Sequence, residues 1–335
     1  MQKHFMRHEY VSVIIPTYNQ QDFIRETIES VIAQTYPQLE IIITDDGSSD
    51  RTVAIVQEYA DAIPGKFILV TSPRNTGIAN NMNRGLAAHT GEYIAWLGGD
   101  DLMLPDKISK QVELMTNRPD VVGCCHNAMV FQSEDGKELG LFTELYSGKR
   151  ELTEGGIELF FNPGHKMLPS TMMIRSSACP PHGFDERLKY VNDILFDIEV
   201  FRQGRCAVIQ EMLGKYRRHG KNITDSPKIK EAAFEENLML LGIVQARYPE
   251  LGRLVRKRRL ILTMTEAVRA YSQNDSVRYA HLLGSLHADK SRLRALGTRI
   301  FCMLFGSSLS NMVKQPTHAI PHWFVRFVNI VRRNL

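Results

Sequence analysis

The strongest constraint on the fold is an alternation of short apolar runs with stretches of helical periodicity near the start of the chain. The apolar runs cover residues 11–15, 39–44, 66–71 and 92–97. Runs that are apolar on both faces and separated by helices are typical of a largely parallel sheet covered on both sides. The sequence therefore predicts an α/β fold of Rossmann-like type, with a mainly parallel central sheet and helices on both faces.

Polar clusters directly follow three of these runs. They lie at residues 17–19, 45–46 and 100–101. In sheets of this kind, ligands bind at the carboxyl ends of the strands. We therefore expect a binding site formed by these clusters at one edge of the sheet.

Two explanations fit the acidic pairs at residues 45–46 and 100–101. Carboxylates in an open site suit Mg²⁺ or Mn²⁺ that bridges phosphates. The same residue types also favour turns and the first turn of a helix, and residue 100 shortly precedes a predicted helix from Lys107. Because two such pairs follow two neighbouring strands of the predicted sheet, we favour the metal hypothesis.

The net charge separates two parts of the chain. The formal charge of +4 combines 23 Lys and Arg against 30 Asp and Glu in residues 1–225, a net −7, with 18 against 7 in residues 226–335, a net +11. Strand-like runs also end there, and helical spacing continues from about residue 228. We predict an α/β domain at residues 1–225 and a basic, mainly helical C-terminal region at residues 226–335.

Composition and cysteine usage exclude several classes. The content is 43% hydrophobic with no biased tract, which excludes a disordered tail or a collagenous repeat. The five cysteines are odd in number and never spaced C-x-x-C, which argues against a disulfide framework and a structural zinc site. The sequence has no signal-peptide pattern and no apolar window long enough to span a bilayer. We expect a cytoplasmic protein, either soluble or peripheral on the inner face of the cell membrane.

Four motifs in order give the chain a resemblance to a known family. They are VSVIIPTYN at residues 11–19, ITDDGSSD at 43–50, NTG at 75–77 with NRG at 83–85, and YIAWLGGDD at 93–101. Further matches are GFDERL at residues 183–188, ND at 192–193, RQG at 202–204 and YRRH at 216–219. Over residues 10–222 the sequence resembles glycosyltransferase family 2, whose members have the nucleotide-sugar-binding GT-A fold.

This resemblance implies an inverting transfer of a sugar from a nucleotide diphosphate donor to a hydroxyl acceptor. A UDP-linked donor is expected, with a hexosyl or N-acetylhexosaminyl group. The acceptor is expected to be a carbohydrate or a lipid-linked saccharide of bacterial cell-surface polysaccharide or lipid-linked oligosaccharide synthesis. The expected cofactor is Mn²⁺ or Mg²⁺, which neutralises charge on the leaving diphosphate.

The resemblance also carries roles onto individual positions. Asp46 is expected to accept from the N–H of the nucleobase, and Asp193 is expected to be the general base. Asp101 is the favoured metal ligand, with Asp100 beside the ribose and metal. His219 matches a histidine that closes over the diphosphate or metal in some members, although a surface histidine in a basic run explains it equally well. The donor-binding set is Pro16, Tyr18, Asp46, Asn75, Gly77, Asn83 and Asp100, and the metal set is Asp101, Asp100 and His219.

Three positions depart from the family pattern. Gly98 replaces the first carboxylate of the acidic motif, Met82 replaces an arginine, and Asn192 replaces a glutamate before the proposed base. None of the three removes the base, so an active enzyme is the leading hypothesis. The alternative is a catalytically silent nucleotide-sugar-binding or scaffold protein of the same fold. The chain lacks G-x-G-x-x-G after the first run and any Walker sequence, which argues against a dehydrogenase and a P-loop kinase.

The C-terminal region has two candidate surfaces. A basic cluster at residues 253–259 has few aromatic neighbours, so we expect a solvated helical face and no nucleic acid partner. Residues 320–333 place aromatic and aliphatic side chains on one helical face and basic ones on the other. Such a helix suits an anionic membrane surface. A terminal helix that docks on the protein's own body explains the pattern nearly as well.

Overall fold

The computed structural model describes residues 7–147, 151–162, 167–220, 222 and 227–288. The helix predicted at residues 320–333, and with it the membrane hypothesis for that segment, lies outside the described residues. By backbone packing the chain divides into two compact units. The first is formed by residues 1–144, 149–160 and 167–229, and the second by residues 145–148, 161–166 and 230–335.

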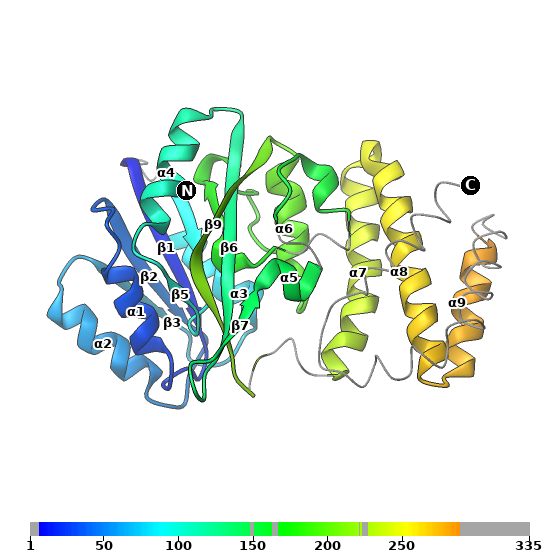
Figure 1. The fold of residues 1–335 in the computed structure, drawn as a ribbon, viewed down its shortest axis with the longest axis horizontal. Helices are drawn as coiled ribbons and strands as arrows, with labels where there is room; N and C mark the ends of the chain where they lie inside the picture. The colour runs from blue at the N-terminus through cyan, green and yellow to red at the C-terminus, as the bar shows by residue number, and fades with distance from the viewer. Residues whose placement is uncertain (1–6, 148–150, 163–166, 221, 223–226, 289–335) are drawn as a thin grey trace. The chain divides into compact units, whose positions relative to one another are not determined.

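The first unit is built on one mixed sheet (Figure 1). Its strands are β1 (Arg7–Thr17), β2 (Leu39–Asp45), β3 (Phe67–Thr71), β4 (Gly91–Trp96), β5 (Leu102–Met103), β6 (Val121–Gln132), β7 (Glu138–Leu141), β8 (Met173–Arg175) and β9 (Arg205–Arg218). The strand order is β3-β2-β1-β4-β8-β6-β9-β5, with β7 paired to β6.

The sheet is parallel in its first half and mixed beyond it. β1 pairs in parallel with β2 and β4, and β2 with β3. β8 is antiparallel to both of its neighbours, β4 and β6, and β6 is parallel to β9. Two reversals in succession restore the direction, so β1, β2, β3, β4, β6 and β9 all point the same way. The carboxyl ends of these six strands therefore lie along one edge of the sheet.

Helices cover both faces of this sheet, as the sequence predicts. They are α1 (Ile24–Ile32), α2 (Thr52–Ala62), α3 (Ile78–Ala88), α4 (Lys107–Asn117), α5 (Phe142–Ser147) and α6 (Asn192–Phe201). Successive strand residues point to opposite faces. Val13 and its odd-numbered neighbours pack with α1, α2 and α4 in one core cluster, whereas Ile14 meets Gly85 of α3. Trp96, which pairs with Ile14, packs edge-on against Phe196 of α6.

The second unit is helical. It contains α7 (Pro227–Arg247), α8 (Gly252–Ser272) and α9 (Ser276–Ala288). Phe234, Ala267 and Leu282 bring the three helices into one small core. None of the described helices is both long enough and apolar enough to cross a membrane.

Candidate active site

The first predicted donor loop follows β1 and is fixed by the loop after β2. Asn19 has a left-handed backbone with φ 51°, and its side-chain oxygen accepts the N–H of Ser49 at 2.9 Å. Its own N–H donates to the hydroxyl of Ser48 at 2.8 Å. Pro16 pairs with Thr44 one residue before the end of β1, and the Tyr18 side chain is exposed. The loop thus presents an aromatic ring on a rigid turn at the carboxyl edge.

Asp46 is buried inside a cradle of donors from the loop before α3. It accepts the N–H of Thr76 and the N–H of Gly77 at 3.0 and 2.8 Å, and the hydroxyl of Thr76 at 2.7 Å. It also forms an ion pair with Arg84 at 2.7 Å. Burial opposes ionisation, but the donors outweigh it and lower the pKa of Asp46 below its usual value. The site therefore holds a fixed anion at this point.

The other predicted residues of this region have structural partners. Asn75 accepts the N–H of Gly77 at 3.1 Å, and Gly77 starts α3 with φ 94°. Asn83 holds the backbone of Phe184 with both amide atoms, at 2.7 and 3.0 Å. Gly183 has φ 65°, and a Cβ there would lie 2.3 Å from the Asn83 oxygen. Asn83 therefore fastens α3 to the segment before α6.

The acidic loop, residues 98–101, separates its two carboxylates. The side chain of Asp101 is buried and accepts the Ser170 hydroxyl at 2.5 Å and the backbone N–H of Arg217 at 3.0 Å. The Asp100 carboxylate is 19% exposed and lies 2.9 Å from the imidazole Nε2 of His219. The structure therefore brings Asp100 and His219 together and leaves Asp101 behind them.

The electrostatics of the two aspartates also differ. Burial, and then the charge of Asp100, raise the pKa of Asp101 to about 8. Beneath the loop the Lys107 ammonium is fully buried, and burial lowers the pKa of this lysine to about 7. Its Nζ donates to the backbone oxygen of Ser170 at 2.7 Å. The polar groups under the loop thus hold the chain in place rather than facing a ligand.

One face of α1 contacts the acidic loop and the end of β9. Its contact residues are Phe23, Glu26 and Thr27. The Phe23 ring stacks on His219 with centroids 4.5 Å apart. The Arg217 guanidinium lies over the rings of Phe23 and Phe131, at 5.3 and 4.7 Å. It donates to Glu26 at 2.5 Å. These contacts join α1, the end of β9 and the acidic loop.

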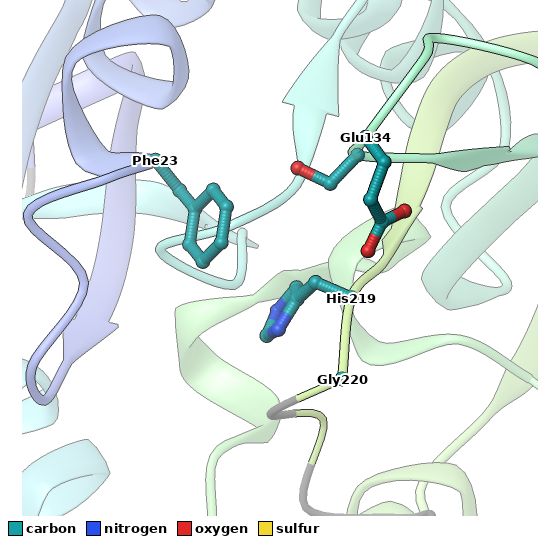
Figure 2. Close-up of a pocket in the computed structure, with 5 residues that line it drawn as sticks. Phe23, Glu134, His219 and Gly220 are labelled. Carbon is teal, nitrogen blue, oxygen red and sulfur yellow. The ribbon is translucent and has the colours of Figure 1, made fainter.

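A cavity of about 420 Å³ opens beside His219. Phe23, Ser133, Glu134, His219 and Gly220 line it. Figure 2 shows how Phe23, Glu134 and His219 surround this opening. Ser133 and Glu134 follow the end of β6, so the cavity lies on the same edge of the sheet. Its volume is within the range of small-ligand pockets.

The predicted base lies on α6. Asp193 is in the first turn of this helix, half-buried, and its carboxylate accepts the N–H of Ile194 at 2.9 Å. One turn further along, burial and the charge of Asp193 raise the pKa of Asp197 well above its usual value. The positive end of the α6 dipole stabilises negative charge in this first turn.

The fit of a divalent ion depends on Asp100 and His219. The described residues contain no group of three or more His, Cys, Asp and Glu side chains arranged to hold a metal. Mg²⁺ in phosphate-binding sites is commonly held by one or two carboxylates, with substrate phosphates and water as the other ligands. A carboxylate and an imidazole 2.9 Å apart, both partly buried and next to the cavity, fit that pattern. The protein groups therefore suit a metal that arrives together with a diphosphate.

Comparison with known proteins decides the family. The sequence profile described as glycosyl transferase family 2 matches residues 12–177, which include the second half of β1, the strands β2 to β4, the acidic loop and Ser170. The chain belongs to glycosyltransferase family 2. The resemblance found in the motifs is thereby confirmed.

Two bacterial proteins illustrate the sequence similarity of this glycosyltransferase. An uncharacterized glycosyltransferase of Haemophilus influenzae is 32% identical over 219 residues, which cover 63% of this chain and 66% of the relative. A putative teichuronic acid biosynthesis glycosyltransferase of Bacillus subtilis, TuaG, is 42% identical over 108 residues, which cover 32% of this chain and 42% of that protein. The match with the first relative thus leaves about a third of its length uncovered.

Solved structures confirm the GT-A fold. S. aureus TarS 1–349 in complex with UDP-GlcNAc aligns with a TM-score of 0.68 at 18% identity, over 92% of each chain. The mannosyltransferase PcManGT of Pyrobaculum calidifontis, in complex with GDP-Man and Mn²⁺, aligns with a TM-score of 0.58 at 17% identity, over 90% of this chain and 83% of that chain.

The sequence alone did not identify four residues of the glycosyltransferase site: Phe23, Lys107, Ser170 and Arg217. Arg217 lies inside the YRRH motif, which is the one available signal. Phe23 and Lys107 fit helical patterns that predict core or surface positions, and Ser170 is a single serine in a loop. Phe23, Ser170 and Arg217 contact the acidic loop or His219, and Lys107 supports Ser170, which only the fold reveals.

Proposed function

We propose that this glycosyltransferase transfers a hexosyl or N-acetylhexosaminyl group from a UDP-linked donor to a hydroxyl acceptor with inversion. The observation that carries the proposal is the Asp100–His219 pair, 2.9 Å apart at the carboxyl edge, beside a cavity. The complex of TarS with UDP-GlcNAc supports the nucleotide and the sugar type. The similarity to TuaG, a putative teichuronic acid biosynthesis glycosyltransferase, supports a role in bacterial cell-surface polysaccharide synthesis.

The donor nucleotide is proposed to bind across the ends of β1 and β2. Tyr18 offers an exposed ring on which a nucleobase can stack, and Pro16 borders it. Asp46 Oδ2 already accepts the N–H groups of Thr76 and Gly77 at 3.0 and 2.8 Å. A uracil N–H that binds here would therefore share this oxygen with them or replace one of them. The lowered pKa of Asp46 keeps this acceptor ionised at neutral pH.

The diphosphate is proposed to bind at Asp100 and His219 together with Mn²⁺ or Mg²⁺. When bound, the ion neutralises charge that develops on the leaving diphosphate. Of the sequence-predicted ligands, Asp100 and His219 face this point, and Asp101 supports the loop from behind. The presence of Mn²⁺ in the complex of PcManGT supports a divalent cofactor in this fold.

The acceptor hydroxyl is proposed to lose its proton to Asp193. Inversion requires the base on the face opposite the leaving diphosphate, and the first turn of α6 supplies a half-buried carboxylate from a rigid element. The acceptor is a carbohydrate or a lipid-linked saccharide. An acceptor of the second kind would place the enzyme at the inner face of the cell membrane.

The departures from the family pattern do not favour the silent-protein alternative. A Cβ at Gly98 would lie 2.9 Å from Asp100 Oδ1, so a glycine leaves room for the observed carboxylate. Met82 is buried, and Arg84 supplies the cation that pairs with Asp46. Asn192 donates to the backbone oxygen of Leu188 at 3.3 Å in front of α6.

A two-step experiment tests the proposal. Thermal unfolding with a panel of nucleotide sugars and Mn²⁺ should single out one donor, because a ligand that binds the folded state raises Tm. With that donor, Asp193→Asn should lower hydrolysis or transfer by about 10²- to 10⁴-fold, the usual contribution of a general base. The shift in Tm should remain. A bound donor with no turnover under any acceptor tried would favour the silent alternative, and full turnover by Asp193→Asn would contradict the base assignment.

A further inference from the structure

Side chains from outside the acidic loop bind several of its polar groups. The Ser170 hydroxyl accepts the N–H of Gly98 at 2.9 Å and donates to Asp101 Oδ2 at 2.5 Å. One serine therefore joins the first and last residues of the loop. Ser170 lies in a short 3₁₀ turn, Pro169–Thr171, just before β8.

Thr27 and Arg217 bind further groups of the loop. The Thr27 hydroxyl lies 3.1 Å from the backbone oxygen of Gly99 and 3.0 Å from that of Asp101, so its proton is shared between them. The Arg217 side chain donates from Nε to the backbone oxygen of Asp100 at 2.8 Å, and its backbone N–H donates to Asp101 Oδ1 at 3.0 Å. Among the side chains of the loop, the Asp100 carboxylate alone turns toward His219 rather than inward.

The three holding residues are themselves fixed. Thr27 is fully buried on α1. The Ser170 backbone oxygen receives the ammonium of the fully buried Lys107 at 2.7 Å. The Arg217 guanidinium lies between two aromatic rings and on Glu26. Each residue comes from a different element, so the loop is tied to α1, to the turn before β8 and to β9 at once.

We propose that Thr27, Ser170 and Arg217 are positioning residues that aim Asp100 at a divalent cation shared with His219. The inference rests on the proposed function, because it assigns a purpose to contacts around the proposed metal ligands. The physical reason is that Mg²⁺-type ions demand near-ideal geometry, so a ligand from a free loop would lose affinity. Contacts behind a metal ligand commonly change metal affinity by about 10- to 100-fold when removed.

The neighbouring Thr171 provides a matched control. It is also buried, and its hydroxyl donates to the backbone oxygen of Leu168 at 2.7 Å, without contact with the acidic loop. Thr171→Val therefore removes a buried hydroxyl hydrogen bond one residue from Ser170. Any general loss of stability in this segment affects the control in the same way.

The test measures Mn²⁺ binding in the presence of UDP. The full-length chain and its Thr27→Val, Ser170→Ala and Thr171→Val variants are titrated with Mn²⁺, and free Mn²⁺ is followed by electron paramagnetic resonance. We expect about a tenfold weaker Mn²⁺ affinity for Thr27→Val and Ser170→Ala. Thr171→Val should match the wild-type chain within twofold. UDP binding without metal, measured by calorimetry, should stay within twofold for all variants, and Thr27→Ser should restore Mn²⁺ affinity.

Three results would overturn the inference. One is wild-type Mn²⁺ affinity in both Thr27→Val and Ser170→Ala. Another is an equal loss in Thr171→Val, which would show a general structural effect. The third is failure of Thr27→Ser to restore binding. If the wild-type chain itself binds no Mn²⁺ with UDP, the metal part of the proposed function fails, and the inference falls with it.

Discussion

The two adjacent aspartate pairs look alike in the sequence and differ in the fold. Both pairs follow a strand of the same sheet. Asp45 and Asp46 are both buried and satisfied, the first by Thr17 and Ser48 and the second by its cradle. In the other pair, Asp101 is buried and Asp100 is turned outward to His219. The comparison shows that the groups around a carboxylate determine its role. It is either a fixed hydrogen-bond acceptor or a side chain that can still bind a metal.

The largest expected effect comes from removing the open carboxylate. Asp100→Asn keeps the shape of the side chain and removes its charge. If the carboxylate holds a metal at the leaving diphosphate, turnover with the identified donor should fall on the order of 10³-fold, about 4 kcal/mol of barrier. Tm without ligand should change little, because within the described part of the chain the side chain bonds to His219 alone. Turnover near the wild-type rate would show that Asp100 and Asp46 do not differ in the proposed way.

A substitution in the Asp45–Asp46 pair should instead lower the stability of the fold. Asp46→Ala removes the partner of Arg84 and leaves the donors of Thr76 and Gly77 without an acceptor. Unfolding in denaturant should show a loss of about 3 kcal/mol. Asp61→Ala, at an exposed position of α2, is the control and should change stability by less than about 0.5 kcal/mol. Equal effects of the two substitutions would remove the contrast with Asp100.

The protonation of Asp101 should make the stability of the folded chain depend on pH. Its pKa in the folded chain is raised to about 8, so the folded state keeps a proton that the unfolded state releases near pH 4. The contribution of this bound proton to the stability of the folded state is present below pH 4 and is lost as pH rises toward 8. Asp101→Asn should remove this loss. The stability of the wild-type chain relative to the variant should therefore fall between pH 5 and pH 8, as measured by denaturant unfolding at both values. A constant difference would contradict the buried, protonated state.

The smallest expected effect concerns Gly98. A Cβ there would lie 2.9 Å from Asp100 Oδ1, so Gly98→Ala should turn the carboxylate and weaken Mn²⁺ binding a few-fold. Gly242 of α7 has no atom within 4 Å of an added Cβ. Gly242→Ala should leave Mn²⁺ affinity unchanged and raise stability by up to about 1 kcal/mol. Mn²⁺ titration and unfolding of both variants check the pair.

Much of the fold could be predicted from the sequence. The apolar runs became β1 to β4, and helical periodicity after residue 228 became α7 to α9. The mixed half was harder, because β9 is a 14-residue strand whose burial does not alternate regularly. The domain boundary between residues 225 and 226 stays a prediction from charge and sequence pattern. Backbone packing divides the chain near residue 229.

The location of the candidate site could be predicted from the sequence better than the contacts within it. Strand-end positions identified Asp46 and Asp100 because topology alone brings such ends together. The weight placed on Asp101 as a metal ligand came from its motif position, and no pattern in the sequence distinguishes two neighbouring aspartates. Their difference comes from Ser170 and Arg217, which lie 69 and 116 residues further along the chain.

Helix α1 gives the two ends of the proposed donor site a common support. Its first residues follow the loop that carries Tyr18, and Phe23, Glu26 and Thr27 contact His219, Arg217 and the acidic loop. A nucleobase that restricts the motion of the Tyr18 loop would thereby also restrict the motion of the proposed metal ligands. By thermodynamic reciprocity, the factor by which UDP tightens Mn²⁺ binding must equal the factor by which Mn²⁺ tightens UDP binding. Base and metal recognition would then be one cooperative event, transmitted through a single nine-residue helix.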